Sequence, residues 1–279
     1  MPMMDSVTRL VRMASARFRV THQCINTNLF HCCIQKSGSQ WIKQILRDPV
    51  VFRFSGMPLH DLRKNFIKPG QYDQLRHCPP ARRIISPFYV AYGDFESLSK
   101  PDAYKAFWVM RDPRDVVCSK YYSVRYSHPT NNPGLSRLRS RLENSSKENG
   151  LMHFISALGR RESPQLRCLR SWIDRDPDPR VLSFRYEDLV GQDHLMTFNK
   201  LFEHLDILIP ESDLRKLLKR YSFEALSGRK RGEVDHKSHY RKGVVGDWHN
   251  HFSELHRKAF KESTGTLLVD LGYESNSNW

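Results

Sequence analysis

Residues 30–41 read FHCCIQKSGSQW, an apolar run that passes through a short polar turn into an amphipathic stretch. The run FHCCI predicts a buried strand, and the stretch from Trp41 to Leu46 predicts a helix. Where a strand feeds a helix through a glycine-containing turn, backbone N–H groups and the positive end of the helix dipole favour an anion. Lys36 adds a mobile charge, and Ser37 and Ser39 add hydroxyl donors. The segment predicts either a phosphate-binding turn or an ordinary strand-to-helix turn.

Two more apolar runs share this arrangement. Ala106–Met110 precedes RDPRD and a helical pattern to about Ser123, and Val181–Phe184 precedes RYEDL and a helical pattern to about Leu205. Strands alternating with helices predict an α/β fold with a central, mainly parallel sheet flanked by helices. Ligands of such sheets bind beyond the carboxyl ends of the strands, where all three polar turns fall.

Composition restricts the partner without identifying it. The 279 residues include 45 Lys and Arg against 30 Asp and Glu, a formal net charge of +15. This excess indicates an anionic partner: nucleic acid, a membrane surface, or a small molecule bearing phosphate or sulfate. The longest apolar runs are far shorter than the roughly 20 residues that span a membrane. Six cysteines without a CxxC pair argue against a zinc site and favour a reducing compartment.

Two further segments carry charge beside special backbone residues. In RDPRDVVCS (111–119), Asp112 suits a helix N-cap and Pro113 the first helical position, which leaves Arg111 at the strand end and Ser119 on the helix. In RKGVVGDW (241–248), two cations precede a glycine that lets the backbone approach a phosphate closely. Taken alone, the first segment favours Arg111 and Arg114 paired with neighbouring carboxylates on a solvated surface.

Together, KSGSQW, RDPRDVVCS with YEDL downstream, and RKGVVGDW resemble the sulfotransferase family that uses 3′-phosphoadenosine 5′-phosphosulfate (PAPS) and releases 3′-phosphoadenosine 5′-phosphate (PAP). The order of the motifs and the spacing from Arg111 to Ser119 both match. The resemblance implies metal-free, in-line transfer of a sulfuryl group to a hydroxyl or amine of a small-molecule acceptor. It also implies a single P-loop-like domain, which we place at residues 27–279 after an N-terminal arm of residues 1–26.

The resemblance assigns roles around the first motif. Lys36 would contact the 5′-phosphate and the transferring sulfuryl group. Trp41 and Phe223 would flank the adenine, and Tyr186 of YEDL would approach the nucleotide. The loop around the 5′-phosphosulfate group would consist of Ser37, Gly38, Ser39 and Gln40. The 3′-phosphate would be held by Arg111, Ser119, Arg241, Lys242 and Gly243.

The chain also departs from the family pattern. Gln35, Ser39 and Gln40 stand where the usual loop has Pro and two Thr. In the cytosolic branch a K-[TS]-H segment supplies the general base, but Pro87 occupies the position of that His. Another branch places its base about twenty residues after the loop Lys, where this chain has His60. Since a histidine titrates near neutral pH, we take His60 as the candidate catalytic base; an ordinary surface histidine is the alternative.

Other expectations follow from the remaining sequence. Residues 127–150 are polar and rich in Pro, Gly and Asn, which predicts a long mobile loop with a short basic helix near Leu135–Leu142. The usual dimerisation motif is absent after Trp248, so oligomeric state stays open. We expect a cytoplasmic enzyme with no metal, no nucleic-acid partner and no membrane partner. The alternatives are a degenerate family member that binds nucleotide without transfer, and a basic nucleic-acid-binding protein.

Overall fold

The computed structural model describes residues 20–62, 79–130, 132–160 and 163–279. The chain divides into two compact units. We call residues 1–110 with 176–222 the sheet unit, because it contains every strand in the described part of the chain, and residues 111–175 with 223–279 the helical unit.

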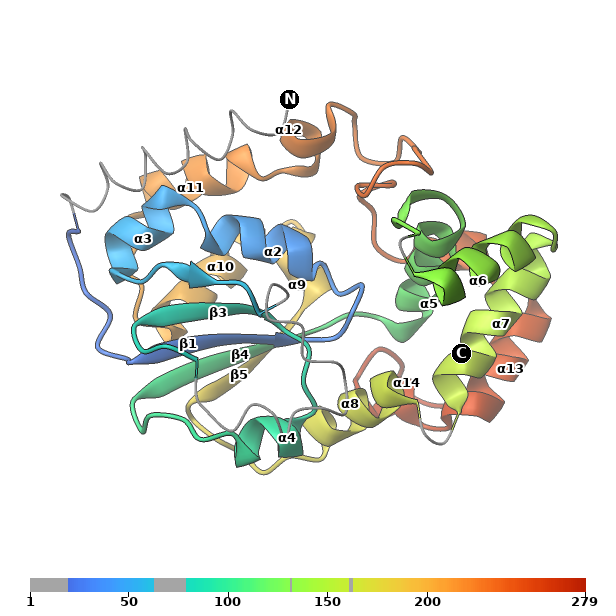
Figure 1. The fold of residues 1–279 in the computed structure, drawn as a ribbon, viewed down its shortest axis with the longest axis horizontal. Coiled ribbons are helices and arrows are strands. Elements are labelled where there is room, and N and C mark those ends of the chain that lie inside the picture. Colours follow the sequence, from blue (N-terminus) through green and yellow to red (C-terminus); the bar gives the residue numbers. More distant parts are fainter. Residues whose placement is uncertain (1–19, 63–78, 131, 161–162) are drawn as a thin grey trace. The chain divides into compact units, whose positions relative to one another are not determined.

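A parallel five-stranded sheet forms the centre of the sheet unit (Figure 1). Its strand order is β2-β3-β1-β4-β5, and each neighbouring pair is parallel. The predicted α/β class with a mainly parallel sheet is therefore confirmed. The strands are β1 (Asn28–Cys33), β2 (Leu59–His60), β3 (Arg83–Phe88), β4 (Tyr104–Met110) and β5 (Val181–Arg185).

The strand order makes the carboxyl end of β1 a special place. From β1 the chain leads to β2 and β3 on one side of that strand, whereas from β4, its other neighbour, it leads to β5 on the opposite side. Adjacent parallel strands whose connections diverge in this way form a topological switch point, where α/β sheets bind their ligands. The turn after β1 lies at this point.

The two faces of β1 are packed differently. On one face Phe30 contacts Phe95 edge-on, with ring centroids 5.4 Å apart. On the other face His31 stacks on Phe107 at 4.7 Å, and its Nδ1 lies 2.7 Å from the hydroxyl of Ser86. Burial lowers the pKa of His31 to about 3, so this imidazole is neutral and fills the core of the sheet.

Short helices flank the sheet. Asp48 caps α3 by accepting a hydrogen bond from the Val50 N–H, and Pro49 takes the first helical position. The strand–turn–helix expected around Lys36 is present, since α2 begins one residue after Gly38. The helices of this unit are α2 (Ser39–Leu46), α3 (Pro49–Ser55), α4 (Tyr92–Ser97), α9 (Tyr186–Val190), α10 (His194–His204) and α11 (Glu211–Arg220).

The helical unit packs around a core of its own. Tyr121, Leu151 and Phe260 are almost fully buried there, and α7 lies beside α13 and α5 (Figure 1). Asp112 and Pro113 begin α5 as expected, because the Asp112 carboxylate accepts the Arg114 N–H. The helices are α5 (Pro113–Tyr122), α6 (Pro133–Glu143), α7 (Lys147–Gly159), α8 (Pro164–Ile173), α12 (Phe223–Ser227), α13 (Glu254–Thr264) and α14 (Leu267–Asp270).

The prediction of a loop over residues 127–150 is wrong for most of that stretch. The short helix expected near Leu135–Leu142 is present within α6, and α7 already begins at Lys147. Two caps explain the helices: Asn132 accepts the Gly134 N–H, and Ser146 accepts the Asn149 N–H. The polar residues that suggested a loop therefore serve partly as helix starts.

The expected N-terminal arm lies outside the described residues as far as residue 19. Residues 20–26 are hydrogen-bonded to other parts of the sheet unit: the Cys24 N–H donates to the Ser55 carbonyl, and the Ile25 N–H donates to Asp206. Five cysteines in the described part of the chain are buried thiols. Among the described residues, no helix is long and apolar enough to cross a membrane.

Candidate functional site

The turn after β1 leaves a helix N-terminus without a side-chain cap. Lys36 and Gly38 both have left-handed backbone conformations, with φ of 72° and 78°. Gly38 occupies the N-cap position of α2 and makes no side-chain cap hydrogen bond, and the first turn has no acidic residue. The first N–H groups of α2 and the positive end of its dipole are therefore presented beside Lys36, an arrangement that suits an anion.

An aromatic ring closes over this turn. A Cβ placed on Gly38 would lie 2.6 Å from Cδ2 and Cε2 of Tyr186, so only glycine fits beneath the ring. Trp41 meets Tyr186 edge-on at 6.1 Å, and its indole N–H donates to the Tyr221 carbonyl at 2.7 Å. Gly38 and Trp41 of the first motif are thus brought together with Tyr186 of YEDL, at the end of β5 and the start of α2.

The two serines of the turn have different partners. The buried Ser37 hydroxyl donates to the Ile34 carbonyl at 2.8 Å, so it stabilises the turn itself. The Ser39 hydroxyl lies 2.8 Å from the Tyr89 hydroxyl, and the Gln40 amide donates to the same Tyr89 oxygen at 3.1 Å. Sequence reasoning missed Tyr89. Its signal is its position directly after β3, a neighbour of β1 in a parallel sheet.

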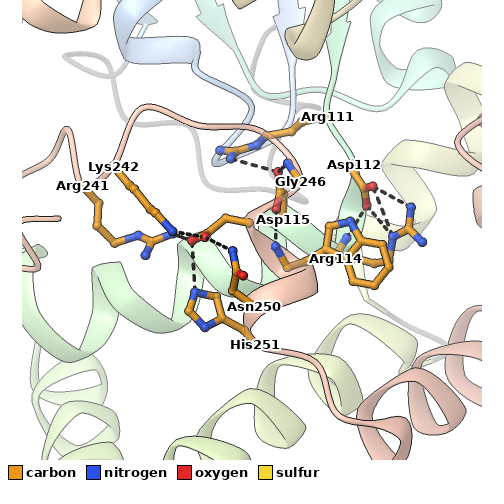
Figure 2. Close-up of polar contacts among 11 residues, drawn as sticks. Arg111, Asp112, Arg114, Asp115, Arg241, Lys242, Gly246, Asn250 and His251 are labelled. Carbon is orange, nitrogen blue, oxygen red and sulfur yellow. Dashed lines mark hydrogen bonds and ion pairs between the residues drawn. The ribbon is translucent and has the colours of Figure 1, made fainter. Parts of the chain in front are cut away.

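A second group of predicted residues lies in the helical unit (Figure 2). Asp115 in the first turn of α5 accepts the backbone N–H groups of Gly246 and Trp248 at 2.9 and 3.0 Å. The same carboxylate lies 3.5 Å from the Arg111 guanidinium. One buried aspartate therefore ties the segment after RKG to the start of α5 and holds Arg111 beside it.

Asp247 gathers the cations of the RKG segment. It is 2 % exposed and accepts hydrogen bonds from Arg241, from Lys242 at 2.5 Å, and from His251 and Asn250 at 3.0 Å. Burial alone would raise the pKa of Asp247, but these four donors hold it well below its usual range. Asp247 lies within the motif RKGVVGDW, but the sequence alone gives it no role.

Gly243 needs its glycine for the same two reasons as Gly38. Its φ is 68°, and an added Cβ would overlap the ring of Phe223. Phe223 is therefore packed directly against the backbone that follows Arg241 and Lys242. Ser119 lies half-buried on α5. The helical unit contains Arg111 together with Ser119, Phe223, Arg241, Lys242 and Gly243.

Arg114 differs from Arg111 despite the short spacing. Its guanidinium binds Asp112 at 2.8 Å and also Glu274, and it stacks on Trp248 at 3.8 Å. Burial would lower the pKa of Arg114, but the hydrogen bonds from Arg114 to both carboxylates raise it. This cation is thus committed to the packing of the helical unit.

The candidate base lies on the edge strand of the sheet. His60 is half-buried in β2 and pairs with Ile85 in the parallel register. Asp61, the next residue, is ion-paired with Lys43 at 2.9 Å, which occupies its carboxylate. In the described part of the chain there is no group of three or more His, Cys, Asp or Glu side chains arranged to hold a metal ion.

A family model described as the sulfotransferase domain matches residues 26–272. The chain belongs to the sulfotransferase family. One domain of the family thus includes segments of both units, and the chain is a sulfotransferase enzyme with an α/β domain of that kind.

Named relatives and solved structures agree with this assignment. Sulfotransferase 1 family member D1 of Mus musculus is 26% identical over 84% of this chain and 81% of its own length. The amine sulfotransferase of Oryctolagus cuniculus is 24% identical over 90% of this chain and 86% of its own. Mouse sulfotransferase SULT7A1, solved in complex with PAP, superposes with a TM-score of 0.63 at 21% identity, covering 94% of this chain and 90% of that one. At 21% identity, the likeness to this solved structure shows the fold alone.

The contact between Gly38 and Tyr186 predicts the effect of a single methyl group. Gly38→Ala should lower the free energy of unfolding by about 2–4 kcal/mol, because it adds a left-handed alanine and a clash with an aromatic ring. Gly228→Ala is the matched control: Gly228 has a φ of 71° with nothing within 4 Å of an added Cβ, so it should cost only about 1 kcal/mol. Urea unfolding of both variants measures the difference, and equal losses would contradict the clash.

The Asp247 cluster predicts a stability loss that depends on pH. Asp247→Asn should lower the free energy of unfolding by about 3 kcal/mol at pH 7, since it leaves buried cations without their anion. The pKa of Asp247 is depressed in the folded state, so its contribution is present above the unfolded value of 3.8 and is lost as pH falls below it. The gap between wild type and variant should therefore narrow below about pH 4.

The exposed ion pair of Lys258 and Glu262 supplies the control for this measurement. Glu262→Gln should change stability by less than about 0.5 kcal/mol at either pH. Chemical unfolding of the three proteins at pH 7 and pH 3.5 tests the prediction. A gap for Asp247→Asn that stays constant with pH would show that its charge is not what stabilises the cluster.

Proposed function

We propose that this sulfotransferase takes its sulfuryl group from PAPS and passes it to a hydroxyl or amine of a small-molecule acceptor. The observation that carries the proposal is the uncapped N-terminus of α2, presented beside Lys36 by two left-handed residues at the switch point of the sheet. A helix end of this kind favours a phosphate or sulfate group. Supporting it, the helical unit holds Arg111, Arg241 and Lys242 close to one another through Asp115 and Asp247.

The roles that we propose for the donor-binding residues follow the family resemblance, motif by motif. We assign the 5′-phosphosulfate group to Lys36 and the α2 turn, from Ser37 to Gln40, and we assign Trp41 and Tyr186 to the nucleoside with Phe223. The 3′-phosphate is assigned to the residues of the helical unit that surround RKG: Arg111, Ser119, Arg241, Lys242 and Gly243. Arg241 and Lys242 are already ordered by Asp247, so little side-chain entropy remains to be lost when an anion binds.

The chemistry assigned to these residues is positioning and charge stabilisation. Displacement at sulfur builds negative charge on the oxygen that leaves with the 5′-phosphate. Lys36 and the first N–H groups of α2 would stabilise that charge without reorganising, which is the efficient form of electrostatic catalysis. The proposed transfer is in-line and uses no metal, so the attacking oxygen or nitrogen must lose its proton to a side chain or to solvent.

We propose that His60 accepts this proton, because Pro87 occupies the position where the cytosolic branch of the family has its catalytic histidine. Proton removal by a positioned side chain typically contributes a factor of about 100 to 10,000 in rate. The acceptor is proposed to be a small molecule. Cytoplasmic location is proposed from the five buried cysteine thiols and from the plant relative named cytosolic sulfotransferase 3.

Donor binding is tested by ligand affinity. Calorimetry with PAP should show binding to the wild-type protein, and neither ATP with Mg²⁺ nor single-stranded DNA should bind comparably. Lys36→Met should weaken PAP roughly tenfold and slow transfer from labelled PAPS about 100-fold, because one charge-assisted contact is lost in binding and a further one in the transition state. Lys200→Met, at an exposed lysine of the same unit, is the control. A wild-type protein that does not bind PAP but binds DNA would favour the alternative of a basic nucleic-acid-binding protein.

The base is tested by separating turnover from binding. His60→Ala should retain the PAP affinity of the wild type and lower kcat by at least about 100-fold. His194→Ala, at an exposed histidine of the sheet unit, should change neither quantity. Full turnover by His60→Ala would remove His60 from the mechanism. Binding of PAP by a wild-type protein that transfers to no acceptor would favour the degenerate family member.

A further inference from the structure

We propose that Tyr89 is a further residue of the donor-binding turn. In this assignment its hydroxyl holds Ser39 so that the Ser39 proton is presented to the 5′-phosphosulfate group. The inference rests on the proposed function. It adds a residue that follows β3, outside the motif that carries the family resemblance.

The first step is the use of the two serine hydroxyls. The Ser37 side chain is fully buried and donates inward to the Ile34 carbonyl. The Ser37 proton is therefore used in a hydrogen bond within the turn. Ser39 has the other side-chain hydroxyl between Gln35 and Trp41. Any hydrogen bond from a side-chain hydroxyl of this segment to a ligand therefore has to come from Ser39.

The second step is the direction of the hydrogen bonds around Tyr89. The Gln40 Nε2 atom can only donate, so the Tyr89 oxygen accepts at 3.1 Å. When Tyr89 in turn donates to Ser39 Oγ at 2.8 Å, the Ser39 proton points away from Tyr89. The result is a chain that runs from the Gln40 amide through Tyr89 to Ser39. Each bond polarises the next, which strengthens the final donor towards an anion.

The third step explains why Gln40 and Tyr89 belong together. The family pattern has a hydroxyl at the position of Gln40, and this chain has a longer amide there. Cys32 of β1 is in register with Phe88 of β3, so the residue after Phe88 emerges beside the turn that follows β1. A tyrosine at this place returns a hydroxyl to the turn, and the glutamine amide is long enough to orient it.

A purely structural tyrosine would behave differently from a donor-binding one. If Tyr89 only stabilised the fold, its loss would weaken every ligand alike. If it positions the Ser39 proton, its loss weakens ligands that have a 5′-phosphate and spares those that lack one. The pair PAP and adenosine 3′-monophosphate differs in that single group and therefore separates the two roles.

The experiment measures the affinity of both nucleotides by calorimetry. Tyr89→Phe keeps the ring and should weaken PAP roughly tenfold, the scale of one hydrogen bond to a charged group, while leaving adenosine 3′-monophosphate unchanged. Ser39→Ala removes the same proton from the other end and should give the same selective loss. Tyr92→Phe, which removes a phenol hydroxyl from α4 of the same unit, is the control and should change neither affinity.

A double-mutant cycle tests the chain of hydrogen bonds. Because Gln40 acts through Tyr89, Gln40→Met should add no further loss of PAP affinity in the Tyr89→Phe background. Additive losses, equal losses for the two nucleotides, or unchanged PAP affinity in Tyr89→Phe would each overturn the assignment. A wild-type protein that binds neither nucleotide would instead refute the proposed donor, which keeps the two failures apart.

Discussion

The left-handed turn between β1 and α2 is the constraint on which the candidate chemistry depends. A non-glycine residue in this conformation costs about 1–2 kcal/mol, and Lys36 adopts it. The surrounding contacts hold it there: Ser37 donates back to the end of β1, and the Tyr186 ring lies on Gly38. With the backbone reversed in this way, α2 starts without a side-chain cap. Its N–H groups and dipole are directed to the place where Lys36 is held.

Buried carboxylates play the corresponding part in the helical unit. Arg111, Arg241 and Lys242 are three cations from distant parts of the sequence, and Asp115 and Asp247 hold them beside one another. Three cations and two carboxylates leave the cluster with one net positive charge. Because each cation already has an anion, the cluster stays packed without a ligand. A bound phosphate would then compete with Asp247 for the same donors instead of meeting isolated, fully hydrated charges.

The local parts of the fold and the site could be predicted because their signals are local. The strand, turn and helix around Lys36 and the start of α5 at Asp112 each follow from a few consecutive residues. The loop predicted over residues 127–150 left out α7 and the ends of α6, because Asn132 and Ser146 serve both as turn formers and as N-caps. Composition favours the turn, and the buried Leu151 and Phe154 beyond it decide for the helix.

The long-range parts could not be predicted from motifs. Tyr89 reaches Ser39 across 50 residues, and Asp115 accepts the Trp248 N–H across 133. Neither contact leaves a pattern in the nearby sequence. The order of strands in the sheet would have pointed to Tyr89, since β3 neighbours β1, but that order becomes known only with the structure. Asp247 stood within a recognised motif, yet its role depends on burial among four donors.

The formal charge of +15 does not by itself indicate an anionic partner, because several arginines form hydrogen bonds within the fold. Arg82 donates to the carbonyls of Cys24 and Asn26, and Arg139 donates to those of Val124 and His128. Arg229 donates to the carbonyls of Tyr240, Arg241 and Glu233 and so shapes the RKG segment from behind. A guanidinium has five donors and suits such cross-links between loops, where its charge is incidental. Arg82, Arg139 and Arg229 thus serve the fold, whereas carboxylates hold Arg111, Arg241 and Lys242 at a strand end and beside a glycine turn.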